Sequence, residues 1–153
     1  MVLEVVTAGA PILKQIAQQI KFVGRHERAL LNDMVDTMYA SEGVGLAAPQ
    51  IGFSMRIIVV DDGNGLIEMV NPVIIKAIGS VIDEEGCLSC PGFTGPVNRS
   101  ELITVEGLDR NMKKITLECS GLLARIFQHE IDHLDGVLFT EKAISLKQSS
   151  PEG

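Results

Sequence analysis

Apolar side chains recur at helical spacing over residues 121–134. They fall at offsets of three and four along this segment, which is the spacing of one face of an α-helix. Apolar residues cover most of the helix surface, so little of it can be exposed to solvent. We therefore expect a central helix covered by other elements. Ser120 can act as its N-cap, and Gly136 can end it in the left-handed conformation.

Two more helices are expected in the first third of the chain. Apolar positions at helical spacing predict a helix over residues 26–42. A shorter helix is expected over residues 11–20, because Pro11 suits a first helical turn. The stretch from 43 to 50 follows, and with Pro49 inside it we expect an edge strand.

Alternating patterns and turn residues predict strands in the rest of the chain. Residues 55–60 and 66–70 flank a stretch rich in Asp, Gly and Asn, which predicts a hairpin. Residues 101–108 and 113–118 flank a second turn and predict another hairpin, and a short strand is expected over 137–139. Runs of strands followed by a helix indicate an α+β fold, with antiparallel sheets wrapped around the central helix.

The composition is that of one small domain with a substantial core. The chain has 153 residues, of which 46% are hydrophobic, and we expect a single domain over 1–147 with a frayed polar tail over 148–153. The net charge of −7 argues against nucleic-acid binding. Three cysteines without a signal peptide favour a reducing compartment, the cytoplasm. No apolar run has the length of a membrane span.

The central helix carries the sequence His129-Glu130-Ile131-Asp132-His133. Histidines four residues apart lie on one helix face and can bind the same metal ion. Glu130 lies between them, where its carboxylate can accept the proton of an attacking water. A histidine on an apolar stripe is usually a hydrogen-bonded core residue, but two in register with an acid between them favour metal binding. The pattern is typical of metallohydrolases, and the central helix is thus an HExxH helix.

A catalytic metal of the zinc type usually takes three protein ligands, so a third has to be found. His26 is the only other histidine, and a capping or solvent-exposed role is expected for it. Cys87 is the best candidate, because the preceding glycine lets a thiolate approach from a strand edge. Its spacing from Cys90 also fits a redox pair, although a packed small hydrophobe is the favoured interpretation of Cys90. With only Cys119 left, a four-cysteine zinc site is excluded.

Three separated segments together resemble one known family. Residues 43–50 (GVGLAAPQ), 85–89 (EGCLS) and 128–133 (QHEIDH) are similar, in sequence and in order, to the three signature motifs of peptide deformylases. Further similarities, such as Asn71-Pro72, extend the resemblance over nearly the whole chain. It implies an enzyme that removes the formyl group from N-formylmethionine on new polypeptides.

The resemblance also implies roles for individual residues. The metal ligands would be Cys87, His129 and His133. Glu130 would take a proton from water and later give one to the leaving amine, while the Gln50 side chain and the Leu88 backbone N–H would stabilise charge on the formyl oxygen. The remaining implied site residues are Gly43, Val44, Gly45, Leu122 and Ile126, which would bind the substrate, and the ion pair of Glu85 and Arg99, which would hold the Cys87 segment.

The implied cofactor is one divalent metal ion per chain. A thiolate with two imidazoles suits Fe(II), Zn(II), Ni(II) or Co(II), and the resemblance implies Fe(II) in the cell. The implied partner is the N-formylmethionyl nascent polypeptide, and we expect a monomer. The resemblance leaves undecided whether the protein contacts the ribosome transiently. Many bacterial relatives make this contact with a C-terminal helix, whereas this chain stops soon after 137–139.

Two departures and two alternatives accompany the resemblance. Cys90 stands where the family usually has an aliphatic residue, and the family's arginine between 91 and 96 is absent. A zinc endopeptidase would share the helix motif, but the ligand such enzymes carry downstream is missing. A non-catalytic metal-binding relative would be expected to lose Gln50 or Glu130 first, and both are present.

Overall fold

The computed structural model describes residues 1–149. Its helices are η1 (Pro11–Lys14), α1 (Arg25–Ala40), η2 (Ala48–Ile51), α2 (Gly121–Leu134) and α3 (Phe139–Lys142). Its strands are β1 (Gly45–Ala47), β2 (Ile57–Asp61), β3 (Leu66–Ile78), β4 (Val81–Gly86), β5 (Phe93–Arg99), β6 (Leu102–Leu108), β7 (Lys114–Ser120) and β8 (Lys147–Gln148).

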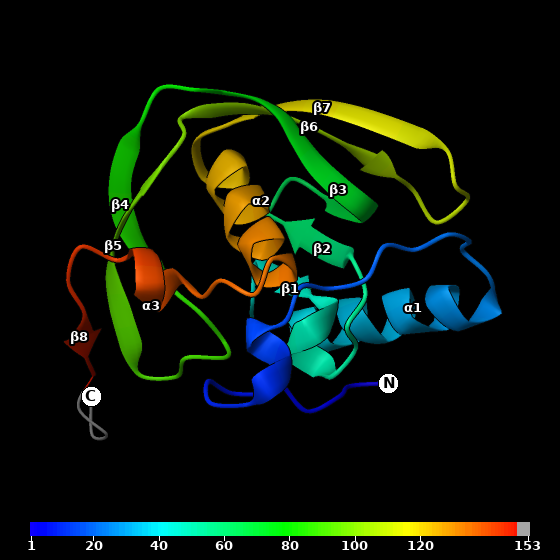
Figure 1. Cartoon of the computed structure of the whole chain (residues 1–153), viewed down its shortest axis with the longest axis horizontal. Helices are drawn as coiled ribbons and strands as arrows, with labels where there is room; N and C mark the ends of the chain where they lie inside the picture. Colours follow the sequence, from blue (N-terminus) through cyan, green and yellow to red (C-terminus); the bar gives the residue numbers. More distant parts are fainter. Residues whose placement is uncertain (150–153) are drawn as a thin grey trace.

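The strands form two antiparallel sheets that surround α2. One sheet has the order β1-β2-β3-β6-β7 and the other β4-β5-β8. In Figure 1, α2 lies at the centre, β3, β6 and β7 arch over one end of it, and β4 and β5 lie beside it. Phe127 and Leu134 of α2 are fully buried in the main core cluster, while α1 packs in a second cluster with β1 and β2. The expected α+β fold around a central helix is confirmed.

Most of the predicted elements are present. The central helix has the predicted bounds, α1 ends at Ala40 rather than at 42, and both hairpins form, as β2–β3 and β6–β7. The edge strand expected over 43–50 is limited to β1, and Pro49 lies in η2. Gly136 takes the expected left-handed conformation, with φ 76°.

The helix predicted over residues 11–20 is wrong. Only the short 3-10 helix η1 forms, and Gln15 is already extended. The following backbone finds tertiary partners instead: the Ala17 N–H donates to Leu134 O at 2.8 Å, and the Gln18 N–H donates to Ser54 O at 3.0 Å. Because these bonds satisfy the backbone, a helix is not required there.

Strand β3 continues well beyond residue 70, where the prediction ended it. Asn71 takes a left-handed conformation, with φ 52°, and the pairing with β6 shifts register between Val70 and Val73. This bulge accommodates Pro72, which cannot donate a ladder hydrogen bond. The Asn71 side chain bonds both backbone groups of Ile20, at 2.8 Å and 2.7 Å. The pair β4–β5 was not predicted either, because Gly95 and Pro96 interrupt the strand pattern.

Three local expectations near the end of the chain are also corrected. The strand expected over 137–139 is absent, since Phe139 begins α3 and its buried side chain belongs to the same core cluster as Val97 of β5. Ser120 precedes α2 but makes no side-chain cap hydrogen bond. Gln148, which was assigned to the tail, lies in β8 and pairs with Phe93 of β5. The rest of the predicted tail, residues 150–153, lies outside the described part of the chain.

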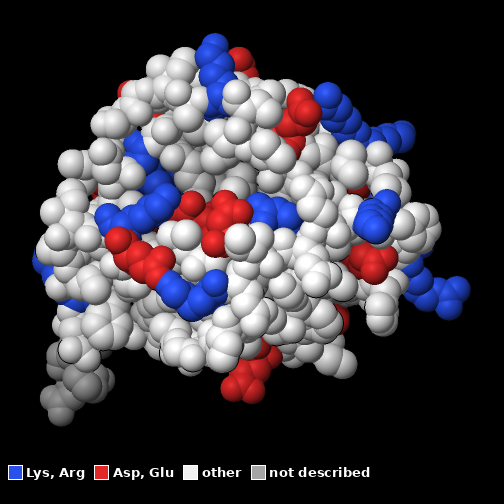
Figure 2. Space-filling model, viewed as in Figure 1, with Lys and Arg blue, Asp and Glu red and all other residues white. Residues whose placement is uncertain are grey.

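The surface carries mixed charge. Figure 2 shows one face, on which basic and acidic side chains are interspersed. Within residues 1–149, helices fall short of the length and hydrophobicity that crossing a membrane requires.

Candidate metal centre

Helix α2 presents both histidines of the motif to the interior. His129 and His133 lie one turn apart, and both are buried, as is Glu130 between them. The rest of the helix is held by apolar packing of Phe127 and Leu134 against the surrounding sheets. The ring of Phe139 stacks on His129, with centroids 6.0 Å apart. The helix is therefore a rigid support for the two imidazoles.

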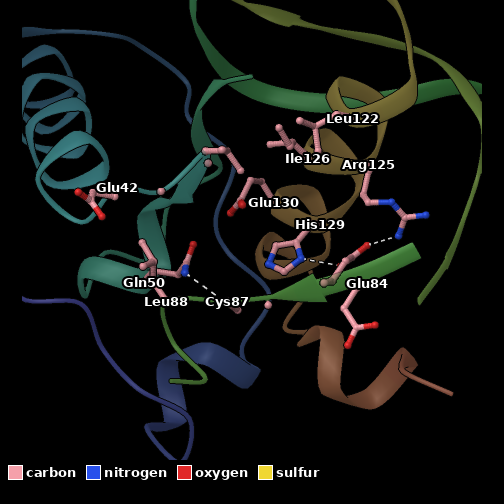
Figure 3. Close-up of a pocket in the computed structure, with 15 residues that line it drawn as sticks. Glu42, Gln50, Glu84, Cys87, Leu88, Leu122, Arg125, Ile126, His129 and Glu130 are labelled. Carbon is pink, nitrogen blue, oxygen red and sulfur yellow. Dashed lines mark hydrogen bonds and ion pairs between the residues drawn. The ribbon is translucent and has the colours of Figure 1, made fainter. Parts of the chain in front are cut away.

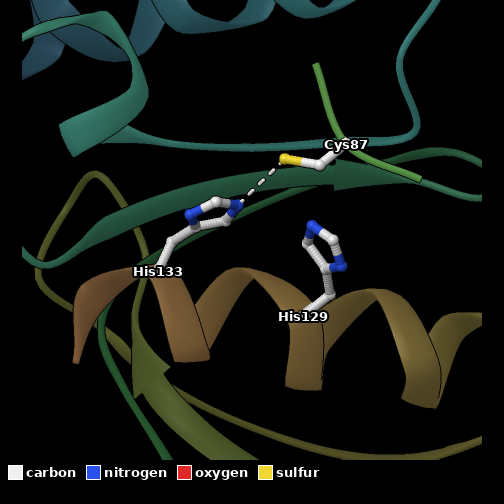
Figure 4. Close-up of side chains that lie close together, drawn as sticks. All are labelled: Cys87, His129 and His133. Carbon is white, nitrogen blue, oxygen red and sulfur yellow. Dashed lines mark hydrogen bonds between the residues drawn. The ribbon is translucent and has the colours of Figure 1, made fainter. Parts of the chain in front are cut away.

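Cys87 approaches the histidines from the end of the three-stranded sheet β4-β5-β8. It directly follows β4, which ends at Gly86. Its Sγ lies 3.3 Å from His133 Nε2, and the candidate ligand atoms of Cys87, His129 and His133 all lie within 4.8 Å of one another. Figure 4 shows the three side chains converging. The three ligands expected from the sequence are thus brought together, whereas His26 is exposed at the start of α1.

These residues fit a single metal ion. Tetrahedral coordination at the usual metal–sulfur and metal–nitrogen distances places such ligand atoms roughly 3.5 Å apart, close to the 3.3 Å between Cys87 Sγ and His133 Nε2. Burial, followed by the charges of His129 and Arg99, lowers the pKa of His133 to about 3. His133 is therefore neutral at pH 7, the form that binds metal. Glu130 Oε1 is buried without a protein hydrogen-bond partner, so a polar group is expected beside it.

A buried carboxylate orients the other histidine. Glu85 Oε1 lies 2.8 Å from His129 Nδ1, which leaves His129 Nε2 for the centre. Arg99 donates to both oxygens of Glu85 at 2.9 Å. Burial raises the pKa of Glu85, but the hydrogen bonds with Arg99 and His129 outweigh it and lower that pKa to about 2. The pair suggested by the resemblance is in place and ionised.

Two further charged residues join this network and were missed in the sequence. Arg125 donates to Glu85 Oε2 at 2.6 Å and to the carbonyls of Val97 and Val81. Asp132 accepts from Arg99. A sequence signal was available for Arg125, because a cation on the buried face of a helix requires a buried acid as partner.

Glu130 occupies space that only a glycine leaves free. A Cβ on Gly45 would lie 2.7 Å from Glu130 Oε2 and 2.9 Å from Ile126 Cγ2. The family resemblance implied that Gly45 binds substrate, and the structure adds that Gly45 leaves room for the Glu130 carboxylate. Burial raises the pKa of Glu130 to about 7, so this carboxyl can exchange a proton near neutral pH.

Gln50 points its amide into the site from η2. Its Oε1 accepts the Ala47 N–H at 2.9 Å, which fixes the orientation of the amide. Its Nε2 donates to Ser89 Oγ at 3.2 Å and lies 3.5 Å from Cys87 Sγ. A fixed N–H donor therefore lies beside the candidate ligands, where it can meet negative charge on a substrate oxygen.

A cavity of about 410 Å³ opens onto these groups. Figure 3 shows Gln50, His129 and Glu130 facing it, and Cys87 also lines it. The predicted substrate-binding residues all line it, namely Gly43, Val44, Gly45, Leu122 and Ile126, and so does Leu88, the predicted backbone donor to the formyl oxygen. Val44 and Leu122 are exposed at its edge, and Ile126 is buried. Glu42 and Glu84 also line it and were not predicted.

A buried HExxH helix, a third ligand from a neighbouring sheet and a cavity beside the acid define a mononuclear metallohydrolase. A family model for polypeptide deformylases matches residues 2–149. The chain belongs to the polypeptide deformylase family.

Relatives and solved structures agree with this placement. The chain is 58% identical to the peptide deformylase of Carboxydothermus hydrogenoformans over 93% of both chains, and 50% identical to that of Pelotomaculum thermopropionicum over 99% of this chain and 97% of the relative. The crystal structure of the Thermotoga maritima peptide deformylase matches with a TM-score of 0.90 and 36% identity, covering 99% of each chain. The Synechococcus elongatus enzyme, solved in complex with actinonin, matches with a TM-score of 0.90 and 38% identity over 94% of this chain and 79% of that one.

Proposed function

We propose that this chain removes the formyl group from N-formylmethionine at the start of new polypeptides and releases formate. The observation that carries the proposal is the convergence of Cys87, His129 and His133 within 4.8 Å, with the Glu130 carboxyl and the Gln50 amide facing the same cavity. Membership of the deformylase family supports the choice of substrate.

The metal would be held by the Cys87 thiolate, His129 Nε2 and His133 Nε2. When bound, a divalent ion supplies Lewis acidity that activates water and polarises the formyl oxygen. Glu85 and Arg99 keep His129 oriented, since Glu85 accepts from the ring nitrogen that faces away from the centre.

Glu130 would act as general base and then general acid. Its pKa of about 7 allows it to accept a proton from the attacking water and return it to the leaving amine at neutral pH. Its packing against Gly45 and Ile126 fixes its position, so little reorganisation is needed during the reaction.

Gln50 and the Leu88 backbone N–H would bind the formyl oxygen as charge develops on it. The Gln50 amide is held by Ala47, so its Nε2 is oriented before substrate arrives. Preorganised donors of this kind stabilise a tetrahedral oxyanion better than water does, because they need no rearrangement.

The cavity walls would select the methionine side chain. Val44, Leu122 and Ile126 give it apolar walls, which suit an unbranched thioether. Edge strand β1, which begins at Gly45 and follows Gly43 closely, offers backbone groups for pairing with an extended peptide. The enzyme would thus bind the substrate through its main chain, with little preference for the side chains that follow methionine.

The finer parts of the proposal are ferrous iron as the native metal, a monomeric state, a cytoplasmic location and a transient ribosome contact. The mixed thiolate and imidazole ligands support iron among several metals. The free cysteines Cys87, Cys90 and Cys119 are consistent with a reducing compartment.

Product analysis distinguishes the proposal from its alternatives. A formylated Met peptide, the acetylated Met peptide and an unmodified longer peptide are incubated with the metal-loaded enzyme and analysed by mass spectrometry. We expect loss of formyl from the first only. Cleavage within the longer peptide would indicate an endopeptidase, and no turnover at full metal content would indicate a non-catalytic metal-binding protein.

A further inference from the structure

Cys87 and Cys90 lie at the two ends of a tight turn that follows β4. The Cys90 N–H donates to the Cys87 carbonyl at 3.0 Å, which is the hydrogen bond of a β-turn. Such a turn brings its end Cα atoms within about 7 Å, and a disulfide needs about 4.4–6.8 Å. An extended backbone would have pointed the two thiols apart, whereas this turn brings the two Cα atoms close to the separation that a disulfide requires.

The two thiols differ in their access to solvent. Cys87 lines the active-site cavity. Cys90 is 4% exposed and is packed with Leu13, Val97 and Phe139, and Cys87 contacts this same cluster from its cavity side. A small reagent entering the cavity therefore meets Cys87 first, with Cys90 directly behind it.

We propose that Cys87 and Cys90 form a reversible disulfide when a peroxide enters the cavity. The Cys87 thiolate attacks one oxygen of hydrogen peroxide, the O–O bond breaks, and Cys87 sulfenic acid and hydroxide are formed. The Cys90 sulfur then attacks the Cys87 sulfur, the S–O bond breaks, and water leaves. The two cysteines supply the two electrons that reduce the peroxide.

The disulfide abolishes metal binding reversibly and protects Cys87 from further oxidation. A disulfide sulfur is not a thiolate, so His129 and His133 alone would remain to hold the ion, and the ion is released. Reduction by a dithiol restores the Cys87 thiolate. Without Cys90, the sulfenic acid would proceed to sulfinic and sulfonic acids, which are not reversed by thiols. The effect on activity rests on the proposed function, whereas formation of the disulfide does not.

The test uses the zinc-loaded full chain treated with increasing hydrogen peroxide. Zinc release, free thiols and tryptic peptide masses are measured on each sample. Trypsin places Cys87 and Cys90 together in peptide 77–99 and Cys119 in peptide 115–125, so Cys119, 3% exposed in a different core cluster, serves as internal control. We expect peptide 77–99 to lose two hydrogens, free thiols to fall from three to one, and zinc to be released in step, with full return after dithiol treatment.

Cys90→Ser and Cys90→Val are the matched variants, and circular dichroism reports whether each is folded. In a folded variant we expect Cys87 to gain two or three oxygens, with zinc release that a dithiol does not reverse. The proposal is overturned if wild-type peptide 77–99 gains oxygen without forming the internal disulfide, or if wild type and a folded variant recover zinc binding equally. Because thiols and masses are read directly, these outcomes stand whether or not the chain deformylates peptides.

Discussion

Replacing Gly45 with alanine tests whether the position of Glu130 determines the rate. The added Cβ would lie 2.7 Å from Glu130 Oε2 and 2.9 Å from Ile126 Cγ2. Ordinary contact begins near 3.4 Å, so the carboxylate must move by about 0.7 Å, and misplacement by about 1 Å costs on the order of 10²-fold in rate. We therefore expect kcat to fall on the order of 10²-fold, equivalent to about 2.7 kcal/mol in the barrier. Overpacking should also lower the free energy of unfolding by about 1–3 kcal/mol.

The assay measures formate release against peptide concentration, metal content and urea unfolding on the same preparation. Gly43→Ala is the matched comparison, because its only tight contact would be with Leu88 Cδ1, at 3.0 Å, a side-chain end that can rotate away, and Glu130 is not touched. Since Gly43 is assigned to substrate binding, any loss in this variant should appear in KM rather than in kcat. We expect Gly43→Ala to keep kcat within a few-fold, and both variants to keep their metal. A Gly45→Ala enzyme with the wild-type kcat would refute the link between Gly45 and the position of Glu130.

The remaining predictions concern the ligands, the acid and the carboxylate behind His129. Glu130→Gln should keep its metal, because the ligands are untouched, while kcat falls by roughly 10² to 10⁴; near-normal turnover would exclude Glu130 as the base. Cys87→Ala should release the metal, and stoichiometric metal at unchanged affinity in a chelator titration would contradict its assignment as a ligand. Glu85→Gln should weaken metal binding about 10- to 100-fold by loosening His129, measured by the same titration. In the metal-free protein, Glu85 has a pKa of about 2 against an ordinary 4.5, so its ionised form adds at most about 3 kcal/mol to the free energy of unfolding. This contribution is present above pH 4.5 and is lost as the pH falls towards 2. Urea unfolding midpoints that do not decrease from about pH 6 to about pH 3 would contradict this.

The sequence was informative wherever local patterns decide structure. The helix at 121–134 could be predicted to the residue, because its apolar stripe is long and uninterrupted, and the two hairpins around 61–65 and 109–112 could be predicted from their turn residues. The predictions of secondary structure failed where tertiary contacts determine the backbone conformation. Residues 15–20 form backbone hydrogen bonds to distant segments, and Asn71 allows a strand to pass through a proline by means of a bulge.

The candidate site shows the same division. His129 and His133 follow from helical spacing alone, whereas Cys87 had to be chosen by elimination and by the family resemblance. Arg125 could not be assigned a partner from the sequence, because the acid it pairs with lies 40 residues away on β4. The space that Gly45 leaves for Glu130 depends on the packing of β1 on α2, which no local pattern encodes.

The most direct test of the central claim is formate release from a formyl-Met peptide by protein purified without oxygen, with the bound metal quantified on the same sample. We expect rapid formate release that scales with one bound metal ion per chain, stops when a chelator removes the ion, and returns when the ion is restored. A fully metal-loaded, folded protein that releases no formate, or formate release that does not depend on the metal, would contradict the account.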